Sequence, residues 1–457
     1  MGSRMNRRAF LGSVARGGAG LVILTHATSA RSYAANEKLH LAHIGVGGRG
    51  TELFNGFTNA ETSVALCDVS TKKAQRIFER CPHLPRFQDY REMLDKMADE
   101  IDAVIVATPD HSHAPASACA IKAGKPVYTE KPLTRLVGES RALRKLAKEH
   151  KVATSMGNQG TSAGPFRRAL ELIRDGVIGE IKEVHTWNDQ GGADEAQPPK
   201  DEAKVPPYLN WEMWLGPNPL RPYHPKWTAW HSWREFGTCN LGNWASHTQN
   251  LAFMALKVDS LWYADPETKP ILRVEANMNH INRLSFPKWE HVRWDIPKRG
   301  DLPPISFHWH NGSACPTVRD ELKKLLGHDV KWGPPQTWDE WAGCLIIGTE
   351  GKIHATGHNA TFKMVPEEKF KDVQQATPEK VERSAGHERD WLNACRGGKP
   401  AWANYDYAGP LTEFNMLGNV ATQFEGVLEY DPLAGKIVNN EEADKCLNPV
   451  YREGWSL

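Results

Sequence analysis

The stretch LHLAHIGVGGRG, residues 39–50, constrains the fold more than any other part of this sequence. A short apolar run leads directly into Gly45, Gly47 and Gly50, which have the spacing G-x-G-x-x-G. Such a run is typical of a buried parallel strand that turns into a helix. Gly45 then permits a tight turn, Gly47 lets the backbone approach a pyrophosphate, and Gly50 allows close helix packing. By itself the pattern is weak, because a chain with 38 glycines produces it by chance.

The sequence that follows gives the glycine pattern its context. TSVALCD predicts a second strand, which ends in Asp68 about 20 residues beyond the loop. A carboxylate there would accept hydrogen bonds from the adenosine ribose and repel a 2′-phosphate. Asp68 therefore favours NAD over NADP, although Lys72 and Lys73 nearby keep NADP possible.

Strands and helices continue to alternate up to residue 160. Ser70 caps a predicted helix, and the further predicted elements are strands 101–110, 126–132 and 152–160 and helices 113–125 and 137–150. This alternation predicts a doubly wound parallel sheet, in which ligands bind beyond the carboxyl ends of the strands. Three polar stretches lie at those ends: 108–111, 130–132 and 157–159.

The chain is long enough for two or three domains, at 457 residues. After residue 160 the composition shifts to strands such as 305–312 and 342–357, separated by loops rich in Pro and Trp. The predicted division is an N-terminal segment 1–36, a nucleotide-binding domain 38–160, a substrate-binding and oligomerisation domain 161–440, and a tail 441–457.

Composition excludes some classes of partner and site. The formal charge of +1 gives no electrostatic reason to expect nucleic acid or an acidic membrane surface as a partner. The 8 cysteines form no Cys-x-x-Cys pair, and no histidine cluster has metal-ligand spacing, so we expect buried thiols and no metal. The 17 tryptophans line a groove for sugar rings or belong to the core, and the sequence leaves both interpretations open.

The N-terminus predicts export. Arg7 and Arg8 precede Phe10 and Leu11, and a glycine-rich, modestly apolar stretch leads to small residues at 30–35. This pattern is typical of a twin-arginine signal peptide, which places the protein in the periplasm or otherwise outside the cytoplasm. The apolar part is too short to span a membrane, so we expect no membrane attachment after cleavage. The alternative is a disordered basic tail.

The order GVGGRG, ATPDHSHA, TEKPL and GNQG resembles the Gfo/Idh/MocA family of sugar and polyol dehydrogenases. The similarity runs from about Leu39 to the terminal YREGW. It implies an α/β fold with an N-terminal Rossmann domain and a C-terminal α+β domain, whose open, mostly antiparallel sheet commonly forms a dimer or tetramer contact. It also implies that helices within 385–424 return to the first domain.

The resemblance assigns roles around the cofactor. The EKP lysine of the family reaches the reacting centre beside the nicotinamide, and Lys131 matches it. Thr108, Pro109 and His113 would shape the nicotinamide side, with Glu130 against the cofactor. The predicted cofactor-binding residues are Gly45, Gly47, Gly48, Arg49, Gly50, Asp68, Thr108, Pro109, His113, Glu130, Lys131, Asn158 and Gln159.

The resemblance also places a catalytic segment in the second domain. GTCNLGNWASH, residues 237–247, matches a family helix on which an aspartate and a histidine, four residues apart, face the substrate. His247 aligns with the histidine, but Asn243 stands where the aspartate is usual. The predicted catalytic residues are Lys131, Asn243 and His247. The predicted substrate-binding residues are Asn188, Trp230, His231 (often arginine in the family), Trp233, Arg234 and His247.

The asparagine narrows the choice of base. Oxidising a secondary alcohol requires a base within about 2.6–3.2 Å of its O–H, and an amide cannot take a proton. The base is then His247, Lys131 or both through a shared hydrogen bond; we favour His247 as base and Lys131 as its electrostatic partner. His310 and His387 are weaker candidates that we interpret as structural.

Export restricts the reaction, because no sizeable pool of free NAD exists outside the cytoplasm. The hydride must then return to a second substrate or to the same one. The first hypothesis is an oxidoreductase for a sugar, polyol or glycoside hydroxyl with a tightly bound, internally recycled cofactor. The second is a redox-neutral glycoside hydrolase or lyase that works through a keto-sugar. The third is a carbohydrate-binding relative without catalysis.

Overall fold

The computed structural model describes residues 38–315, 318–327 and 341–457. Lys38–Leu457 forms one compact unit. The predicted signal peptide, residues 1–36, lies outside the described residues. Within the described part of the chain, no helix combines the length and apolar character needed to cross a membrane.

The first sheet has six parallel strands in the order β3-β2-β1-β4-β5-β6. The strands are β1 (His40–Ile44), β2 (Thr62–Cys67), β3 (Arg86–Phe87), β4 (Ala103–Val106), β5 (Val127–Thr129) and β6 (Thr154–Met156). This order is the doubly wound arrangement of dinucleotide-binding folds, so the predicted parallel sheet is confirmed.

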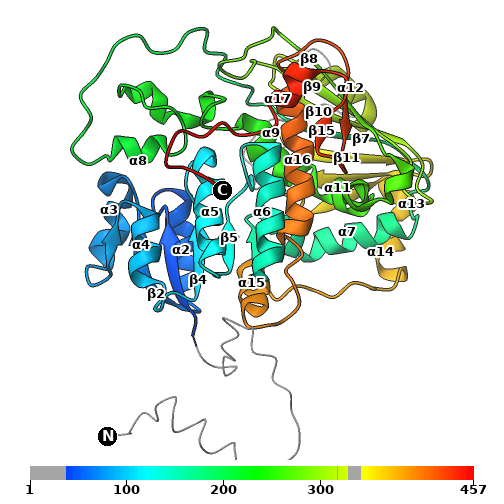
Figure 1. The fold of residues 1–457 in the computed structure, drawn as a ribbon. Helices are drawn as coiled ribbons and strands as arrows, with labels where there is room; N and C mark the ends of the chain where they lie inside the picture. Colours follow the sequence, from blue (N-terminus) through cyan, green and yellow to red (C-terminus); the bar gives the residue numbers. More distant parts are fainter. Residues whose placement is uncertain (1–37, 316–317, 328–340) are drawn as a thin grey trace, which may run out of the picture. The chain divides into compact units, whose positions relative to one another are not determined.

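The helices of the first sheet follow its strands in alternation (Figure 1). They are α2 (Arg49–Thr58), α3 (Thr71–Arg80), α4 (Tyr90–Met97), α5 (His113–Lys122) and α6 (Val137–His150). The predicted Ser70 cap is present, since the backbone N–H of Lys73 donates to Ser70 Oγ (3.3 Å). The sequence did not predict β3 or α4.

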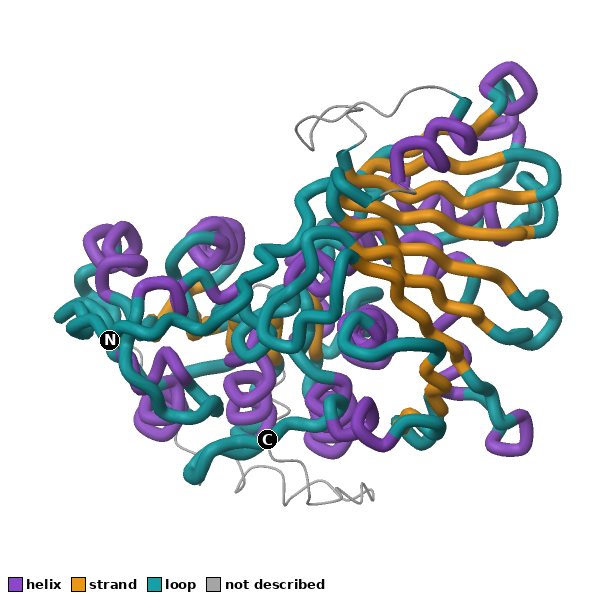
Figure 2. The backbone as a smooth tube through the Cα atoms, turned by 90° about the horizontal axis from the view of Figure 1, so that it is seen from above, coloured by secondary structure: helices purple, strands orange, loops and turns teal. Residues whose placement is uncertain are grey.

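The second sheet contains nine described strands in the order β13-β12-β11-β7-β10-β9-β8-β14-β15, seen as a broad twisted layer in Figure 2. The strands are β7 (Ile181–Asn188), β8 (Leu272–Met278), β9 (Glu290–Ile296), β10 (Ile305–Asn311), β11 (Ala342–Gly348), β12 (Lys352–Thr356), β13 (Phe362–Val365), β14 (Leu428–Asp431) and β15 (Lys436–Ile437). Among these described strands, only β7 and β10 pair in parallel, which confirms the mostly antiparallel sheet.

Helices and short 3-10 turns complete the second part of the chain. The α-helices are α7 (Gly164–Arg174), α8 (Trp211–Leu215), α9 (Cys239–Asn243), α10 (Ala245–Thr248), α11 (Asn250–Ala255), α12 (Val318–Leu326), α13 (Glu367–Phe370), α14 (Val373–Ala376), α15 (His387–Cys395), α16 (Tyr405–Ala421) and α17 (Glu441–Lys445). The 3-10 turns are η2 (Asp110–Ser112), η3 (Gln159–Ser162), η4 (Pro225–Thr228), η5 (Trp230–Ser232), η6 (Val258–Tyr263) and η7 (Pro266–Thr268).

Helix α16 joins the two sheets into one core. All of its residues except Asp406 are buried, as expected for a helix that is covered on every side. It packs against α6 and β6 of the first sheet and against β8 and β9 of the second (Figure 1). Helix α15 contacts β6 as well. Both helices thus return to the first sheet, as the resemblance implied.

The segment that carries Asn243 and His247 differs from the expected single helix. It forms three short helices, α9, α10 and α11, in succession. The backbone N–H of His247 donates to the Trp244 carbonyl (2.9 Å), three residues back instead of four. This tighter turn interrupts the α-helical hydrogen bonding between Asn243 and His247.

Candidate functional site

A cavity of about 460 Å³ runs along the carboxyl ends of the parallel strands. This volume lies within the usual range of small-molecule and cofactor sites. One end is lined by the glycine loop, including Gly45, Gly47 and Gly48, and the other by Lys131 and Asn243. The cavity therefore connects the predicted nucleotide-binding residues with two of the predicted catalytic residues.

The glycines of the loop are required by close packing. A Cβ on Gly50 would lie 2.1 Å from the Gly45 carbonyl oxygen, and one on Gly45 would lie 2.5 Å from the Ala107 carbonyl oxygen. A Cβ on Gly47 would lie 2.9 Å from Lys73 Cβ. Gly48 has φ of +52°, which disfavours any other residue. The loop consequently brings the backbone close to the start of α2, where free N–H groups favour an anion.

Asp68 lies directly after β2, and its carboxylate accepts hydrogen bonds from the backbone of the glycine loop and of the residues before α3. Its Oδ2 accepts from the backbone N–H of Val46 (3.0 Å) and its Oδ1 from that of Ser70 (2.8 Å). Burial raises the pKa of Asp68, and the hydrogen bonds from these backbone groups oppose that shift. Lys73 also lines the cavity. Because a carboxylate and a lysine meet here, the lining of this end does not by itself distinguish NAD from NADP.

Two residues near the glycine loop carry buried polar atoms that lack a hydrogen-bond partner in the described part of the chain. Thr108 Oγ1 is buried and has no hydrogen-bond partner among the described residues. The side-chain amide of Asn158 is also buried, and neither its nitrogen nor its oxygen has a hydrogen-bond partner within the described chain. Such buried polar atoms are costly unless another group satisfies them. Thr108 lines the cavity, whereas Asn158 is not among the lining residues. With the glycine loop, the buried Thr108 hydroxyl forms a site that a polar group of NAD would complete.

His113 fixes the wall next to Thr108. Its Nδ1 lies 2.7 Å from the Pro132 carbonyl oxygen, and its Nε2 lies 2.8 Å from the Thr108 carbonyl oxygen. Both His113 and Pro109 line the cavity, as predicted. The histidine thus ties the end of β4 to the EKP segment that follows β5.

Arg49, Glu130 and Gln159 meet beneath the cavity. Arg49 Nε donates to Glu130 Oε1 (3.0 Å), and the carboxylate raises the pKa of Arg49. In the orientation that satisfies both of its polar atoms, the Gln159 amide accepts from Arg49 and donates to the Gly157 carbonyl. Gly157 must lack a side chain, because a Cβ there would lie 2.6 Å from the Glu130 carboxylate. These three predicted residues are brought together by the fold.

Lys131 and Asn243 form the central contact of the site. Lys131 Nζ donates a hydrogen bond to Asn243 Oδ1. Burial lowers the pKa of Lys131, while the carboxylates of Glu130 and Asp110 act in the opposite direction. Asn243 therefore takes the place of a carboxylate as acceptor for the lysine without adding charge.

His247 is a buried neutral imidazole close to this contact. Its side chain is largely inaccessible, and its ring centroid lies 4.6 Å from that of His358. Burial lowers the pKa of His247 well below its usual value, and the charge of Lys131 lowers it further. His247 Nδ1 has no hydrogen-bond partner among the described residues, and His247 is not among the residues that line the cavity.

The residues predicted to bind substrate separate into two groups. Trp230 and His231 line the cavity with their rings stacked 3.5 Å apart, and burial lowers the pKa of His231. Trp233 and Arg234 instead serve packing: Trp233 Nε1 donates to the Lys226 carbonyl (2.8 Å). The Arg234 guanidinium bonds the Asn282 and Asn419 carbonyl oxygens and Thr422 Oγ1. Asn188 Oδ1 accepts from the Gln190 N–H (3.1 Å) at the end of β7.

The segment between β7 and α9 supplies lining residues that the sequence did not single out. It folds back over the first sheet, where the backbone N–H of Asn210 donates to the Val69 carbonyl (2.9 Å). The added lining residues are Tyr208, Leu209, Met213, Trp214, Tyr223 and Thr228. Trp214 and Tyr223 also belong to an apolar cluster with Trp211, Trp227 and Trp233. The tryptophan-rich composition was the only indication of this wall, and most of these rings are packing residues.

His358 was also missed. Its ring lies between His247 and Trp244, 4.6 Å and 5.2 Å away by centroids. Burial lowers its pKa, and the charges of Lys131 and Arg49 add to that effect. It belongs to a loop after β12 with no motif around it.

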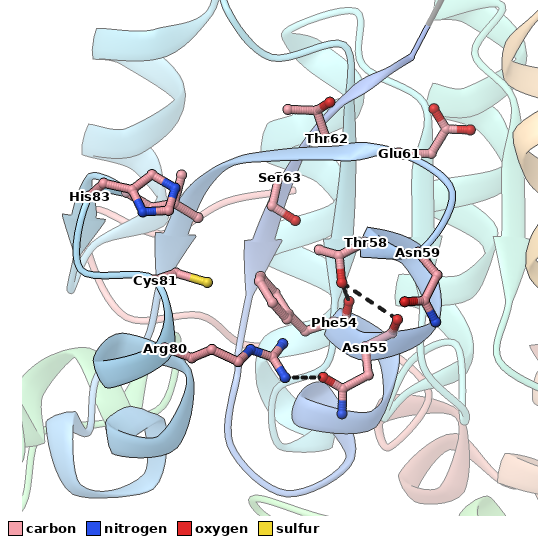
Figure 3. Close-up of a pocket in the computed structure, with 11 residues that line it drawn as sticks. Phe54, Asn55, Thr58, Asn59, Glu61, Thr62, Ser63, Arg80, Cys81 and His83 are labelled. Carbon is pink, nitrogen blue, oxygen red and sulfur yellow. Dashed lines mark hydrogen bonds between the residues drawn. The ribbon is translucent and has the colours of Figure 1, made fainter. Parts of the chain in front are cut away.

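A second hollow, of about 590 Å³, lies between the C-terminal ends of α2 and α3 and the start of β2 (Figure 3). There Arg80 Nη1 donates to Asn55 Oδ1 (2.7 Å). It contains none of the predicted site residues and lies at the amino ends of the strands. In doubly wound folds ligands bind at the other ends, so the cavity along the glycine loop is the candidate site.

Comparison with known proteins supports this assignment for the first domain. Residues 39–158 match the Gfo/Idh/MocA family model, described as an oxidoreductase family with an NAD-binding Rossmann fold. Inositol 2-dehydrogenase of Rhodococcus jostii is 29% identical over 152 residues, 32% of this chain and 41% of its own length. Glycosyl hydrolase family 109 protein 1 of Shewanella sp. strain MR-4 is 29% identical over 156 residues, 32% of this chain and 34% of its own length. Matches to curated relatives span between 29% and 42% of the relatives' own length.

Solved structures share the fold over most of the chain. GenD2 from gentamicin A biosynthesis, determined in complex with NAD, is 18% identical, covers 88% of this chain and 99% of its own, and has a TM-score of 0.57. Aldose-aldose oxidoreductase from Caulobacter crescentus is 16% identical, covers 86% of this chain and 100% of its own, and has a TM-score of 0.54. Residues 39–158 are therefore an NAD-binding Rossmann domain of the kind found in the Gfo/Idh/MocA oxidoreductases, followed by a second domain with the same fold as in those structures.

Proposed function

We propose that the protein is an NAD-dependent oxidoreductase that acts on a hydroxyl group of a sugar, polyol or glycoside. One observation carries the proposal: Lys131 and Asn243 end the same cavity that begins at the glycine loop. His247 does not line the cavity, but it is near enough that the charge of Lys131 adds to burial in lowering the pKa of His247. When bound, NAD would supply a hydride acceptor at this end. NAD is favoured because the Asp68 carboxylate lines the cavity, and Lys73 beside it keeps NADP as the alternative.

Each residue at the catalytic end has a separate task in this proposal. The amide of Asn243 holds the Lys131 ammonium, whose charge stabilises negative charge that develops on the substrate oxygen. His247 is neutral and accepts the hydroxyl proton. Lys131 could itself serve as the base, because burial lowers its pKa. Trp230 and His231 form the wall against which a sugar ring would stack.

A redox-neutral glycoside hydrolase or lyase is the second candidate. The names of the Shewanella relatives point to glycoside cleavage, and His231 provides an imidazole with a lowered pKa in the wall of the cavity. Conversion of a hydroxyl to a ketone acidifies the neighbouring C–H, and His231 would remove that proton before the glycosidic bond breaks. Both candidates use the same cofactor site and differ in the fate of the substrate.

Export by the twin-arginine route is part of the proposal and rests on the sequence of residues 1–36. Because that route carries folded proteins, the cofactor would be loaded before export and retained. Retention requires a hydride balance within each catalytic cycle, either with a second carbohydrate or with the same one. A signal-dependent shift of the protein to the periplasm, measured by cell fractionation with Arg7 and Arg8 intact or replaced by lysine, tests this element.

The central experiment separates the candidates. The purified protein is assayed for bound dinucleotide and then mixed with a panel of sugars, polyols and glycosides, while nicotinamide absorbance and products are followed. Lasting reduction by a sugar supports the oxidoreductase, and cleavage without net reduction supports the hydrolase or lyase. Carbohydrate binding with neither change would leave a non-catalytic binding protein.

We also propose a homo-oligomer, a dimer or tetramer, that associates through the outer face of the second sheet. The resemblance suggests this contact, and light scattering coupled to size-exclusion chromatography tests it. A monomer at micromolar concentration would contradict it.

A further inference from the structure

Four histidines gather on the face of the second sheet that is turned away from the main apolar core. His185 lies on β7, His308 and His310 on β10, and His291 on β9. The register pairs His308 with His185 and His310 with His291. The alternate residues of β10, Phe307 and Trp309, belong to the apolar core. Because side chains alternate along a strand, the histidines of β10 point to the opposite face.

The four rings are ordered by stacking and hydrogen bonds. The centroids of His185 and His308 lie 4.7 Å apart and the rings are nearly parallel, at 7°. His185 Nδ1 is hydrogen-bonded to His310 Nε2 at 3.0 Å, and His308 Nδ1 is hydrogen-bonded to His291 Nε2 at 3.0 Å. The Nδ1 atoms of His185 and His308 are thus both engaged, which leaves their Nε2 atoms for another partner.

Glu183 completes the group. It precedes His185 by two residues on β7, so the two side chains share a face. Its Oε2 lies 3.6 Å from His185 Nε2, beyond hydrogen-bond distance. His185 is 1% exposed, and its Nε2 has no hydrogen-bond partner among the described residues. A buried polar nitrogen therefore faces a carboxylate at ion-pair distance, but without a hydrogen bond between them.

We propose that Glu183, His185 and His308 bind a divalent transition-metal ion of the zinc class. Their ligand atoms lie within 4.8 Å of one another. Two donors at about 2.0–2.1 Å from a tetrahedral Zn²⁺ are about 3.4 Å apart, which is close to the 3.6 Å between Glu183 and His185. Two imidazoles and one carboxylate are a donor set that suits Zn²⁺ and its neighbours and leaves at least one position for water.

The remaining two histidines support the assignment as positioning residues. Metal-bound histidines usually donate their other ring N–H to an acceptor, which fixes the tautomer and the ring orientation. His310 and His291 provide such acceptors for His185 and His308. A polar layer without metal would account for these two hydrogen bonds, but it would leave His185 Nε2 with only the 3.6 Å approach to Glu183 and no hydrogen bond among the described residues. We expected no metal from the sequence, because the proposed ligands lie on two strands more than 100 positions apart and so form no cluster along the chain.

The test uses the full-length, untagged protein after treatment with a chelator. Zn²⁺ is titrated by calorimetry against a competing chelator, and bound zinc is counted by mass spectrometry after gel filtration. The expected result is one ion per chain, with that binding lost in His185→Gln and in His308→Gln. Co²⁺ substitution should give visible absorption bands typical of a low-coordinate N/O site.

Two further variants keep the test decisive. Glu183→Gln changes a half-exposed carboxylate, so it should weaken binding without disturbing the sheet even if the histidine variants fail to fold. His83→Gln alters an exposed histidine far from the cluster and should leave the affinity unchanged. Absence of stoichiometric Zn²⁺ binding, or equal binding by the wild type and folded Glu183→Gln, His185→Gln and His308→Gln proteins, would overturn the proposal.

Discussion

The two ends of the cavity are built in different ways. The nucleotide end comes from one stretch of chain, from Gly45 to Lys73, and depends on glycine backbone and close packing. The catalytic end joins side chains that are far apart in sequence: Lys131 and Asn243 lie 112 positions from each other. Substitutions at the first end should therefore act on stability and cofactor affinity. Substitutions at the second should act on the rate.

The largest expected effect is on the rate, at the catalytic end. His247→Asn removes the proposed base while keeping a buried polar group. We expect kcat to fall by about 10²–10⁴-fold, the usual contribution of general base catalysis. Dinucleotide affinity, measured by fluorescence titration, should stay within a few-fold of the wild type.

The neighbouring histidine supplies the control. His358→Asn changes a ring 4.6 Å away that has a similarly lowered pKa. The His358→Asn substitution should lower kcat by less than about tenfold, because the proposed reaction assigns no proton transfer to His358. If the two variants lose equal activity, or if His247→Asn keeps near-normal activity, His247 is not the base.

The next effect concerns stability at the nucleotide end. Gly50→Ala places a Cβ against the Gly45 carbonyl oxygen. We expect the free energy of unfolding to fall by at least about 2 kcal/mol, as in other overpacked sites, together with dinucleotide affinity. Denaturant titration and ligand titration measure the two losses.

Gly56→Ala is the matched control on the same helix, α2. Its Cβ would meet nothing closer than 3.9 Å, and the residue is exposed. Replacing glycine by alanine in a helix interior stabilises it by about 0.5–1 kcal/mol. Equal effects of the two substitutions would mean that the close approach of Gly45 and Gly50 does not limit the loop.

The contrast between local and long-range contacts also explains how much of the fold was predictable from the sequence. Local pattern was sufficient for most of the first sheet: helix 137–150 was predicted with the bounds that α6 has. It failed for β3, because a strand of two residues is too short to show alternation. The order of the second sheet could not be derived, since it depends on pairing between strands far apart in sequence.

The site residues divide in the same way, into those that lie in a local motif and those that do not. Lys131 and Asn243 were identified because they lie in recognisable motifs, and the structure brings them into contact. Tyr208 was missed because it reaches the cavity through the path of a long loop. His358, which contacts His247, was missed because it lies in the short connection between β12 and β13, where no motif marks it. Arg234 was assigned to the substrate from its motif position, but three acceptors from other segments hold its guanidinium.

An intermediate effect is expected in the pH profile. Asn243→Asp places a carboxylate beside Lys131 and close to His247, and a neighbouring negative charge raises the pKa of a base. Since the base must be unprotonated, the acidic limb of kcat should move to higher pH by about one unit. Asn243→Ala removes the amide without adding charge and should not shift the limb upward. An unchanged profile in Asn243→Asp would show that position 243 is not coupled to the base.

The smallest expected effect probes one hydroxyl at the nicotinamide side. Thr108 Oγ1 is buried and unpaired among the described residues, so Thr108→Val should leave the stability of the free protein unchanged or slightly raised. If the hydroxyl bonds the cofactor, dinucleotide affinity should fall by about five- to tenfold, equivalent to one hydrogen bond. Thr134→Val offers the reverse: Thr134 Oγ1 already donates to the Leu136 carbonyl (2.9 Å), so its loss should lower stability and leave affinity intact. A Thr108→Val protein that loses stability but binds dinucleotide normally would place the cofactor elsewhere in the cavity.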